Sequence, residues 1–208
     1  MSSTARGAAA VSAPATTVLA IDTAVRHRLV VVRADRGGGV IGARLGGEGP
    51  ALPWLNRTVA ELGVAGLGAV VVVTGPGSYT GLRAGMATGL GLAHGLGLPL
   101  HGVSSLEVVA WSAPEGESEI VALVAAGRGG VYAGRFVRSG GGLRMRGEPR
   151  RVGLVEVALG QPPPVTLDAL ELAGVRRGDA VRALALAIPG ALRRAPIPLA
   201  GLAASYLD

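Results

Sequence analysis

A run of glycines that follows an apolar segment constrains the fold of this chain more than any other feature. Residues 75–105 read GPGSYTGLRAGMATGLGLAHGLGLPLHGVSS and come directly after the β-branched run Val70–Val73 and Thr74. This pattern predicts a strand, a glycine turn and then a helix from about Thr80 to Leu96. Glycines recur in that helix at positions 81, 85 and 89, although each costs about 1 kcal/mol relative to alanine. Residues four apart share one side of a helix, so these glycines form a bare stripe that permits very close packing.

The turn before this helix has two interpretations. The helix N-terminus can bind an anion, which would make Gly75, Gly77 and Ser78 contacts for a nucleotide phosphate. Alternatively the glycines only shape the turn and Ser78 only caps the helix. Asp22 and Thr23, which end the first predicted strand, are the other candidate nucleotide-binding residues. Asp22 is either a remnant of a nucleotide site or a hydrogen-bond partner of the turn that follows it.

The composition narrows the kinds of site that the chain can hold. The absence of cysteine among its 208 residues excludes a disulfide framework and a thiolate metal site. All 20 residues counted as Lys+Arg are arginine, and the formal net charge of +6 favours an anionic partner. The densest basic stretch contains Arg135, Arg138, Arg144, Arg146, Arg150 and Arg151. We interpret that stretch as a solvated strand in preference to a surface for nucleic-acid phosphates.

Neither a membrane span nor a secretory signal is evident in the sequence. The most apolar stretch, Ala84–Leu100, is interrupted by five glycines, a histidine and a proline. Residues 1–16 lack the leucine-rich centre of a signal peptide, and we expect them to form a disordered tail. We therefore expect a cytoplasmic protein with no membrane partner.

The order of the predicted elements is that of an α/β fold. The first half gives strands at 18–22, 29–33, 40–45, 70–73 and 100–103, and helices at 53–62, 80–96 and 104–111. The second half repeats this plan weakly, with strands at 120–124, 131–137 and 143–146 and helices at 154–159 and 180–188. We predict a ribonuclease-H-like fold of the actin, sugar-kinase and Hsp70 type, with two tandem halves, 17–111 and 119–208, the second degenerate. The polar segment 112–118 would join them.

The residues give no support for catalysis by this chain. It has no lysine and no G-x-x-x-x-G-K-[ST] run, and Asp22 has no second well-placed carboxylate in the first half. The three histidines, His27, His94 and His101, do not form the pair at i and i+4 that would hold a metal on a helix. We expect neither a catalytic residue nor a metal ligand.

Three segments resemble the TsaB (YeaZ) family. They are VLAIDTA at 18–24, GPGSYTGLR at 75–83 and PLHGVSSLE at 99–107, and the similarity is close over residues 17–112. The resemblance implies a non-catalytic subunit that pairs with TsaD, the catalytic paralogue that transfers threonylcarbamoyl to adenosine in tRNA, and is joined by the ATPase TsaE. It implies that ATP and a divalent metal act in the assembled complex, that this chain alone binds no cofactor, and that tRNA is met through the complex.

The resemblance also implies a partner interface on the helices predicted at 53–62 and 80–96. The residues carried over are Leu55, Val59, Gly81, Leu82, Arg83, Gly85, Met86, Gly89, Leu90 and Ala93. The sequence departs from the family at Ala125 and Gly130, where TsaB-like chains carry an Asp and a Glu. These departures put any polar site in the second half in doubt and leave the predicted docking helix unaffected.

Two other classes of function remain open. One is an enzyme of the same fold, a peptidase or a small-molecule kinase, against which the missing metal ligands and acidic partner argue. The other is a structural protein that forms a homodimer through the glycine helix.

Overall fold

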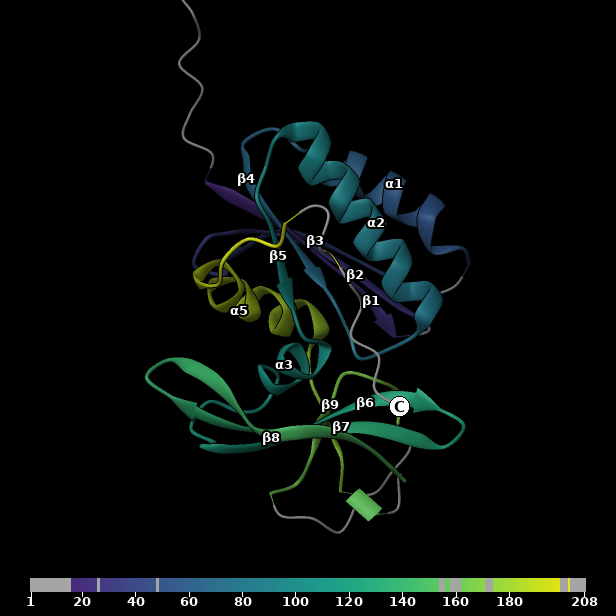
Figure 1. Ribbon diagram of the computed structural model, residues 1–208, viewed down its shortest axis with the longest axis vertical. Coiled ribbons are helices and arrows are strands. Elements are labelled where there is room, and N and C mark those ends of the chain that lie inside the picture. The colour runs from purple at the N-terminus through teal and green to yellow at the C-terminus, as the bar shows by residue number, and fades with distance from the viewer. Residues whose placement is uncertain are drawn as a thin grey trace, which may run out of the picture.

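Two five-stranded sheets, with helices between them and above one of them, form this computed structural model (Figure 1). It describes residues 16–25, 27–47, 49–153, 156–157, 162–170, 174–198 and 202. The strands of the first sheet are β1 (Thr17–Val25), β2 (Arg28–Asp35), β3 (Val40–Gly46), β4 (Leu67–Val73) and β5 (Leu100–Val103). Their order is β3-β2-β1-β4-β5, with β1–β2 and β2–β3 antiparallel and β4 and β5 parallel to β1. The central strands are almost continuously apolar because both faces of this sheet are covered.

The second sheet repeats the plan of the first. It contains β6 (Glu119–Gly127), β7 (Gly130–Ser139), β8 (Gly142–Gly153), β9 (Val165–Thr166) and β10 (Arg176–Arg177), in the order β10-β9-β6-β7-β8. Read from the β8 edge, this is again third, second, first, fourth, fifth, with the same parallel and antiparallel pairs. The fourth and fifth strands have two residues each, against seven and four in the first sheet. The predicted pair of ribonuclease-H-like halves, the second degenerate, is confirmed.

The helices form two layers. Helices α1 (Ala51–Leu62) and α2 (Tyr79–Leu96) cover one face of the first sheet, and α3 (Ser105–Ala110) and α5 (Ala180–Arg193) lie between the sheets (Figure 1). Helix α3 follows β5 but packs against β6, β7 and β9, whereas α5 follows β10 but packs against β1, β2, β3 and β5. Each half therefore contributes a helix to the other sheet, and one hydrophobic core runs through both halves.

Two details of the predicted elements are wrong. Helix α5 does not end at Pro189 but continues to Arg193, because Ile188 and Ala191 on either side of the proline are fully buried. The spacing of Ser104 and Glu107 also predicts a capping box at the start of the helix at 104–111, but Glu107 does not close one. Ser104 Oγ accepts from the Leu106 backbone N–H at 3.2 Å, but the Glu107 carboxylate binds Arg194 Nη2 at 2.5 and 2.6 Å.

Other predicted segments extend differently or lie outside the described residues. The third strand of the second half, predicted over 143–146, runs as β8 from 142 to 153. Of the helix predicted over 154–159 only residues 156–157 are described, and both are helical. The predicted tail, residues 1–16, is outside the described residues except for Thr16.

Candidate functional site

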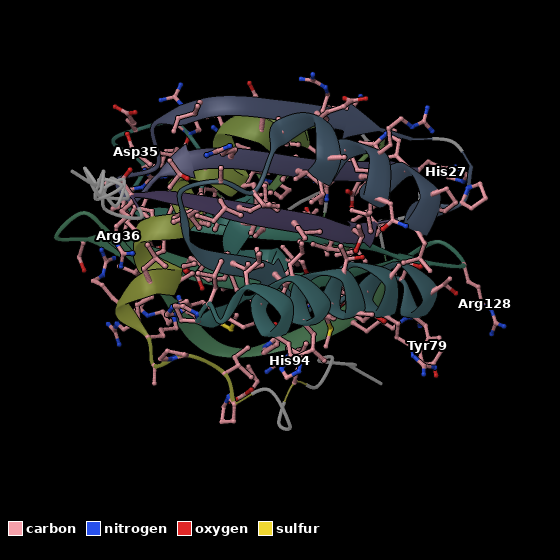
Figure 2. The ribbon with its side chains drawn as sticks, turned by 90° about the horizontal axis from the view of Figure 1, so that it is seen from above. His27, Asp35, Arg36, Tyr79, His94 and Arg128 are labelled. Carbon is pink, nitrogen blue, oxygen red and sulfur yellow. The ribbon has the colours of Figure 1, made fainter. Side chains whose placement is uncertain are left out.

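A cleft of about 560 Å³ lies between the two halves at the end of β1. One wall is the start of α2 with its preceding turn, residues 77–80, and the other is the β6–β7 hairpin, residues 125–128. Figure 2 shows Tyr79 and Arg128 at the same end of the molecule, and both line this cleft. This is where the two interpretations of the glycine turn can be compared with the contacts that its residues make.

The turn residues are tied to β1. The Ser78 backbone N–H donates to the Ala24 carbonyl oxygen at 2.6 Å, and Ser78 Oγ accepts from the Gly81 N–H at 3.4 Å. A Cβ on Gly77 would lie 2.3 Å from the Ala24 carbonyl oxygen, so only glycine permits this approach. Gly75 has φ of 111° and its carbonyl accepts from the Ser105 N–H at 2.9 Å. Of the predicted nucleotide-binding residues, Gly77 and Ser78 line the cleft and Gly75 shapes the turn beneath it.

Asp22 and Thr23 lie below the floor of the cleft and are engaged by the protein itself. Asp22 is 1% exposed, and its Oδ1 accepts from the Ala24 N–H at 2.9 Å. Thr23 is 2% exposed, and its hydroxyl donates to the Gly81 carbonyl oxygen at 2.7 Å. Thr23 ties β1 to α2, and Asp22 accepts from the turn that follows it, as the simpler of its two interpretations predicts.

A buried ion cluster joins the two halves at this level. Arg28 of β2 lies between two carboxylates: its Nη1 donates to Asp22 Oδ2 at 3.1 Å, and its Nε lies 3.4 Å from Asp168 Oδ1. Asp168 follows β9, and its Oδ2 accepts from the Ala125 N–H at 2.7 Å. The three side chains are between 2% and 10% exposed. We call Asp22, Arg28 and Asp168 the buried triad.

Burial and the charge of Arg28 act on the pKa of the Asp168 carboxyl in opposite directions. Removal from water raises the pKa of the Asp168 carboxyl above its ordinary value of 3.8, and this effect outweighs the attraction of Arg28 and the hydrogen bond from Ala125. One arginine therefore serves two carboxylates in a site that water does not reach. The Arg28 guanidinium occupies the space between the two carboxylates.

The raised pKa of Asp168 predicts the pH dependence of stability. The folded chain holds the Asp168 proton more tightly than the unfolded chain, so its stability should fall as pH rises from 3.8 through the raised pKa and should level off above it. An Asp168→Asn variant keeps the acceptor for Ala125 and lacks this titration. Urea unfolding of both proteins from pH 4 to 7 measures the difference. A difference that grows in favour of the wild type with rising pH would show that Arg28 dominates and would contradict the prediction.

The residues that the structure describes contain no group of three or more histidine, aspartate or glutamate side chains placed to hold a metal ion. The three histidines lie apart: His27 follows β1 and His94 is on the exposed side of α2 (Figure 2), and His101 is buried in β5.

The predicted partner interface needs a correction. A Cβ on Gly81 would lie 2.1 Å from the Thr23 carbonyl oxygen, one on Gly85 would lie 2.2 Å from Thr23 Oγ1, and one on Gly89 would lie 2.2 Å from Val72 Cγ1. The glycine stripe thus faces β1 and β4 in the core of the monomer. The same holds for other carried-over residues, which are buried: Leu55, Val59, Leu82, Met86 and Ala93. Leu90 is half-buried and packed against the core. Only Arg83 of this set is exposed.

The outward face of α1 and α2 is apolar and grooved. One hollow of about 570 Å³ is lined by residues 50–53 together with Tyr79, Arg83 and Ala87. A second, of about 410 Å³, continues between the helices, and Leu52 and Ala87 line both. Leu52 is 50% exposed and Tyr79 58%. We call this surface the α1–α2 groove.

Sequence reasoning missed two members of the buried triad, Arg28 and Asp168. The signal for Asp168 was the run Pro164-Val-Thr-Leu-Asp168, in which an acid follows a short β-branched run much as Asp22 follows Leu19-Ala-Ile. Arg28 had no signal of its own, because an arginine at the start of a strand is ordinary.

Comparison of the sequence and the fold with known proteins identifies the family of this chain. The family model described as "TsaD: tRNA N6-adenosine threonylcarbamoyltransferase" matches residues 51–206. The TsaB protein of Bacillus subtilis, a tRNA threonylcarbamoyladenosine biosynthesis protein, is 40% identical over 88 residues, which are 41% of this chain and 38% of that protein. The chain belongs to the TsaB (YeaZ) group of this family.

Two further relatives extend the comparison. An uncharacterized protein of Mycobacterium tuberculosis is 43% identical over 103 residues, 45% of this chain and 47% of the relative. YeaZ from Pseudomonas aeruginosa superposes with a TM-score of 0.71 at 23% identity and covers 92% of this chain and 100% of its own, which shows a common fold. The matched segments span less than half the length of these curated relatives.

None of the helices in the described residues combines the length and hydropathy that crossing a membrane requires.

Proposed function

We propose that this chain is a non-catalytic subunit of tRNA threonylcarbamoylation that pairs with a TsaD-like catalytic subunit through the α1–α2 groove. A TsaE-like ATPase would join the pair, and tRNA would be met by the assembled complex. ATP and a divalent metal would then belong to the assembly, which fits the lack of a metal-binding group of side chains among the described residues of this chain. The curated relatives named TsaB, from Bacillus subtilis and Escherichia coli, support the pathway.

The buried triad supports the non-catalytic part of the proposal. In a two-half fold of this kind the cleft between the halves is the natural place for chemistry. Here the acids nearest the cleft, Asp22 and Asp168, are buried, and each accepts a hydrogen bond from a backbone N–H group and lies beside Arg28. Asp168 Oδ1 has no hydrogen-bond partner among the described residues, but it lies against Arg28 Nε and is buried away from the cleft. A carboxylate buried beside a guanidinium is a poor general base, since a substrate cannot approach it.

The α1–α2 groove is the observation that carries the pairing. Leu52 and Tyr79 are large hydrophobic side chains that the monomer leaves about half exposed, and they border adjoining apolar hollows. Such a surface on a folded chain is typical of a protein interface. The glycine stripe contributes indirectly, because it seats α2 close to the sheet and so fixes the outer face of the helix.

Leu52→Asp tests the pairing. A charge placed in the centre of the groove should weaken binding to the host's TsaD by about 2 kcal/mol or more, roughly thirtyfold. Stability should change by less than about 0.5 kcal/mol because Leu52 is exposed. The matched control is Leu45→Asp on the edge strand β3, where the leucine is 61% exposed and lies outside the groove. Co-purification with TsaD and TsaE, with and without ATP, gives the composition of the complex, and calorimetry gives the affinity.

Each alternative function has its own outcome in this experiment. A chain that binds only itself, with a dimer that Leu52→Asp dissociates, would be a homodimeric structural protein. Turnover of a peptide or a phosphoryl acceptor by the purified chain would make it an enzyme. If the Leu52→Asp and Leu45→Asp variants bind TsaD equally well, the interface lies outside the α1–α2 groove.

A further inference from the structure

The outer face of the second sheet carries a row of arginines. Strand pairing places Arg135 of β7 directly opposite Arg146 of β8, with Arg144 and Arg150 opposite Val137 and Ala133 on the same face. This is the face of Val121, which pairs with Arg135, and it points away from α3 and the main core. We call Arg135, Arg144, Arg146 and Arg150 the outer arginine row.

The two other arginines of this basic stretch have structural roles. Arg138 lies over the Trp111 ring at 5.6 Å from its centroid and donates to the Ala113 carbonyl oxygen at 3.1 Å. Arg151 donates to the Gly127 carbonyl oxygen at 3.3 Å. Arg138 is half-buried by these contacts, whereas Arg151 is exposed and lies opposite Tyr132, on the other face of the sheet from Arg135. The outer arginine row has no such explanation.

Like charges directly opposite each other on neighbouring strands destabilise a sheet. The single ion pair of the row among the described residues joins Arg146 Nη1 to Glu119 at 3.3 Å, and both side chains are more than half exposed, so it contributes little. The side chains of Arg135, Arg144 and Arg150 make no hydrogen bond or ion pair with any described residue. Glu148 and Glu156 are nearby but pair with none of them. An external anion would relieve this repulsion.

The row borders a hollow of about 360 Å³ that combines charge with an apolar floor. Arg135, Arg146 and Arg150 line it together with Val121, Val152 and Pro162. Arginines two residues apart on one strand are separated by about 6.6 Å. Only Arg144 and Arg146 have this spacing, since Arg150 lies beyond a register shift in β8 and Arg135 lies opposite Arg146 on β7. The four guanidinium groups form an elongated band. Such a band suits an extended chain of phosphates better than a single small anion, and guanidinium is the side-chain group that binds phosphate most specifically.

We propose that the outer arginine row binds the phosphate backbone of RNA. The choice of RNA over other polyanions rests on the proposed function, in which the complex acts on tRNA. Glu148 and Glu156 fit this choice, because carboxylates beside a phosphate-binding surface can accept hydrogen bonds from ribose 2′-hydroxyls. The row is on the second half, and the α1–α2 groove is on the first, so the chain can meet both partners at once (Figure 1).

The test uses a double variant, Arg135→Gln with Arg150→Gln, which leaves the Arg146–Glu119 pair intact. Binding of host tRNA is measured by fluorescence anisotropy for the chain alone and for the chain with TsaD, from 50 to 200 mM salt. Removing two phosphate contacts should lower the slope of log affinity against log salt by about 2 and weaken binding by roughly tenfold per contact at 0.1 M salt. Arg36→Gln, at the exposed β2–β3 turn of the first sheet, is the matched control and should change neither quantity.

The outcomes separate this inference from the proposed function. Loss of tRNA affinity and salt slope in the double variant alone, with TsaD binding unchanged, supports the row as an RNA surface. If the chain alone shows the same loss and forms no complex with TsaD, the outer arginine row is supported as an RNA surface and the proposed pairing with TsaD is contradicted. Unchanged affinity and slope, or no tRNA binding by chain or complex, overturns the inference whether or not TsaD binds. Equal affinity for a DNA of the same sequence, or binding of anionic lipid vesicles in place of tRNA, overturns the choice of RNA.

Discussion

Gly81→Ala is expected to destabilise the folded chain by about 3 kcal/mol, the upper part of the range for overpacked cores. The added methyl group would lie 2.1 Å from the Thr23 carbonyl oxygen. That oxygen is backbone in β1, which is held between β2 and β4 and cannot move aside. For a chain of this length the loss corresponds to a fall of roughly 6–12 °C in Tm.

Gly95→Ala is the matched control in the same helix, because Gly95 lines neither hollow of the α1–α2 groove. A Cβ at Gly95 meets nothing within 4 Å, so the substitution should stabilise α2 by about 1 kcal/mol. Thermal unfolding of both variants, with TsaD binding measured beside it, checks the pair. A Gly81→Ala chain with an unchanged Tm and lost TsaD binding would show that the stripe forms the interface after all.

The glycine stripe shows what the periodicity of a sequence can predict and what it cannot. The spacing of 81, 85 and 89 correctly identifies one close-packed side of a helix. It does not identify the segment that packs there, because a strand of the same chain and a helix of a partner can both pack closely against a row of glycines. The fold identifies the neighbour, because α2 lies over β1 and β4, where Thr23 and Val72 occupy the space that side chains would need.

The strands of the first sheet could be predicted from the sequence more completely than those of the second. The first sheet has long β-branched strands and a glycine hairpin turn, so its strands were found with errors at the ends. In the second sheet β9 and β10 have two residues each, and a period of two cannot be recognised in two residues. The place of β9 is fixed by pairing with β6, from which it is more than 40 positions away in the sequence, and β10 in turn pairs with β9.

The buried triad could not be predicted because its members meet only in the folded chain. Asp22 and Arg28 are neighbours across the β1–β2 hairpin, but Asp168 arrives from the far half through the poorly patterned region around β9. The family acid that is missing at Ala125 is relevant here. The Asp168 carboxylate, which comes from another segment, accepts a hydrogen bond from the backbone N–H of Ala125.

Arg28→Met should cost about 3–5 kcal/mol of stability, because it leaves two buried carboxylates without their cation. The length and volume of the side chain are nearly kept, so the loss reports charge and not a cavity. Chemical denaturation at pH 7 measures it. Below the raised pKa of Asp168 the cost should shrink, since the protonated carboxyl no longer needs a cation.

The triple variant Asp22→Asn, Arg28→Met and Asp168→Asn separates structure from chemistry. It removes all three charges and keeps the acceptors for the Ala24 and Ala125 N–H groups, so most of the lost stability should return. If the triad is only structural, the refolded chain should still pair with TsaD and support threonylcarbamoyl transfer by the assembled complex. A stable triple variant that assembles but supports no transfer would mean that Asp22 or Asp168 takes part in the reaction. The proposal that this chain is non-catalytic would then be wrong, because Asp22 and Asp168 are the residues on which it rests.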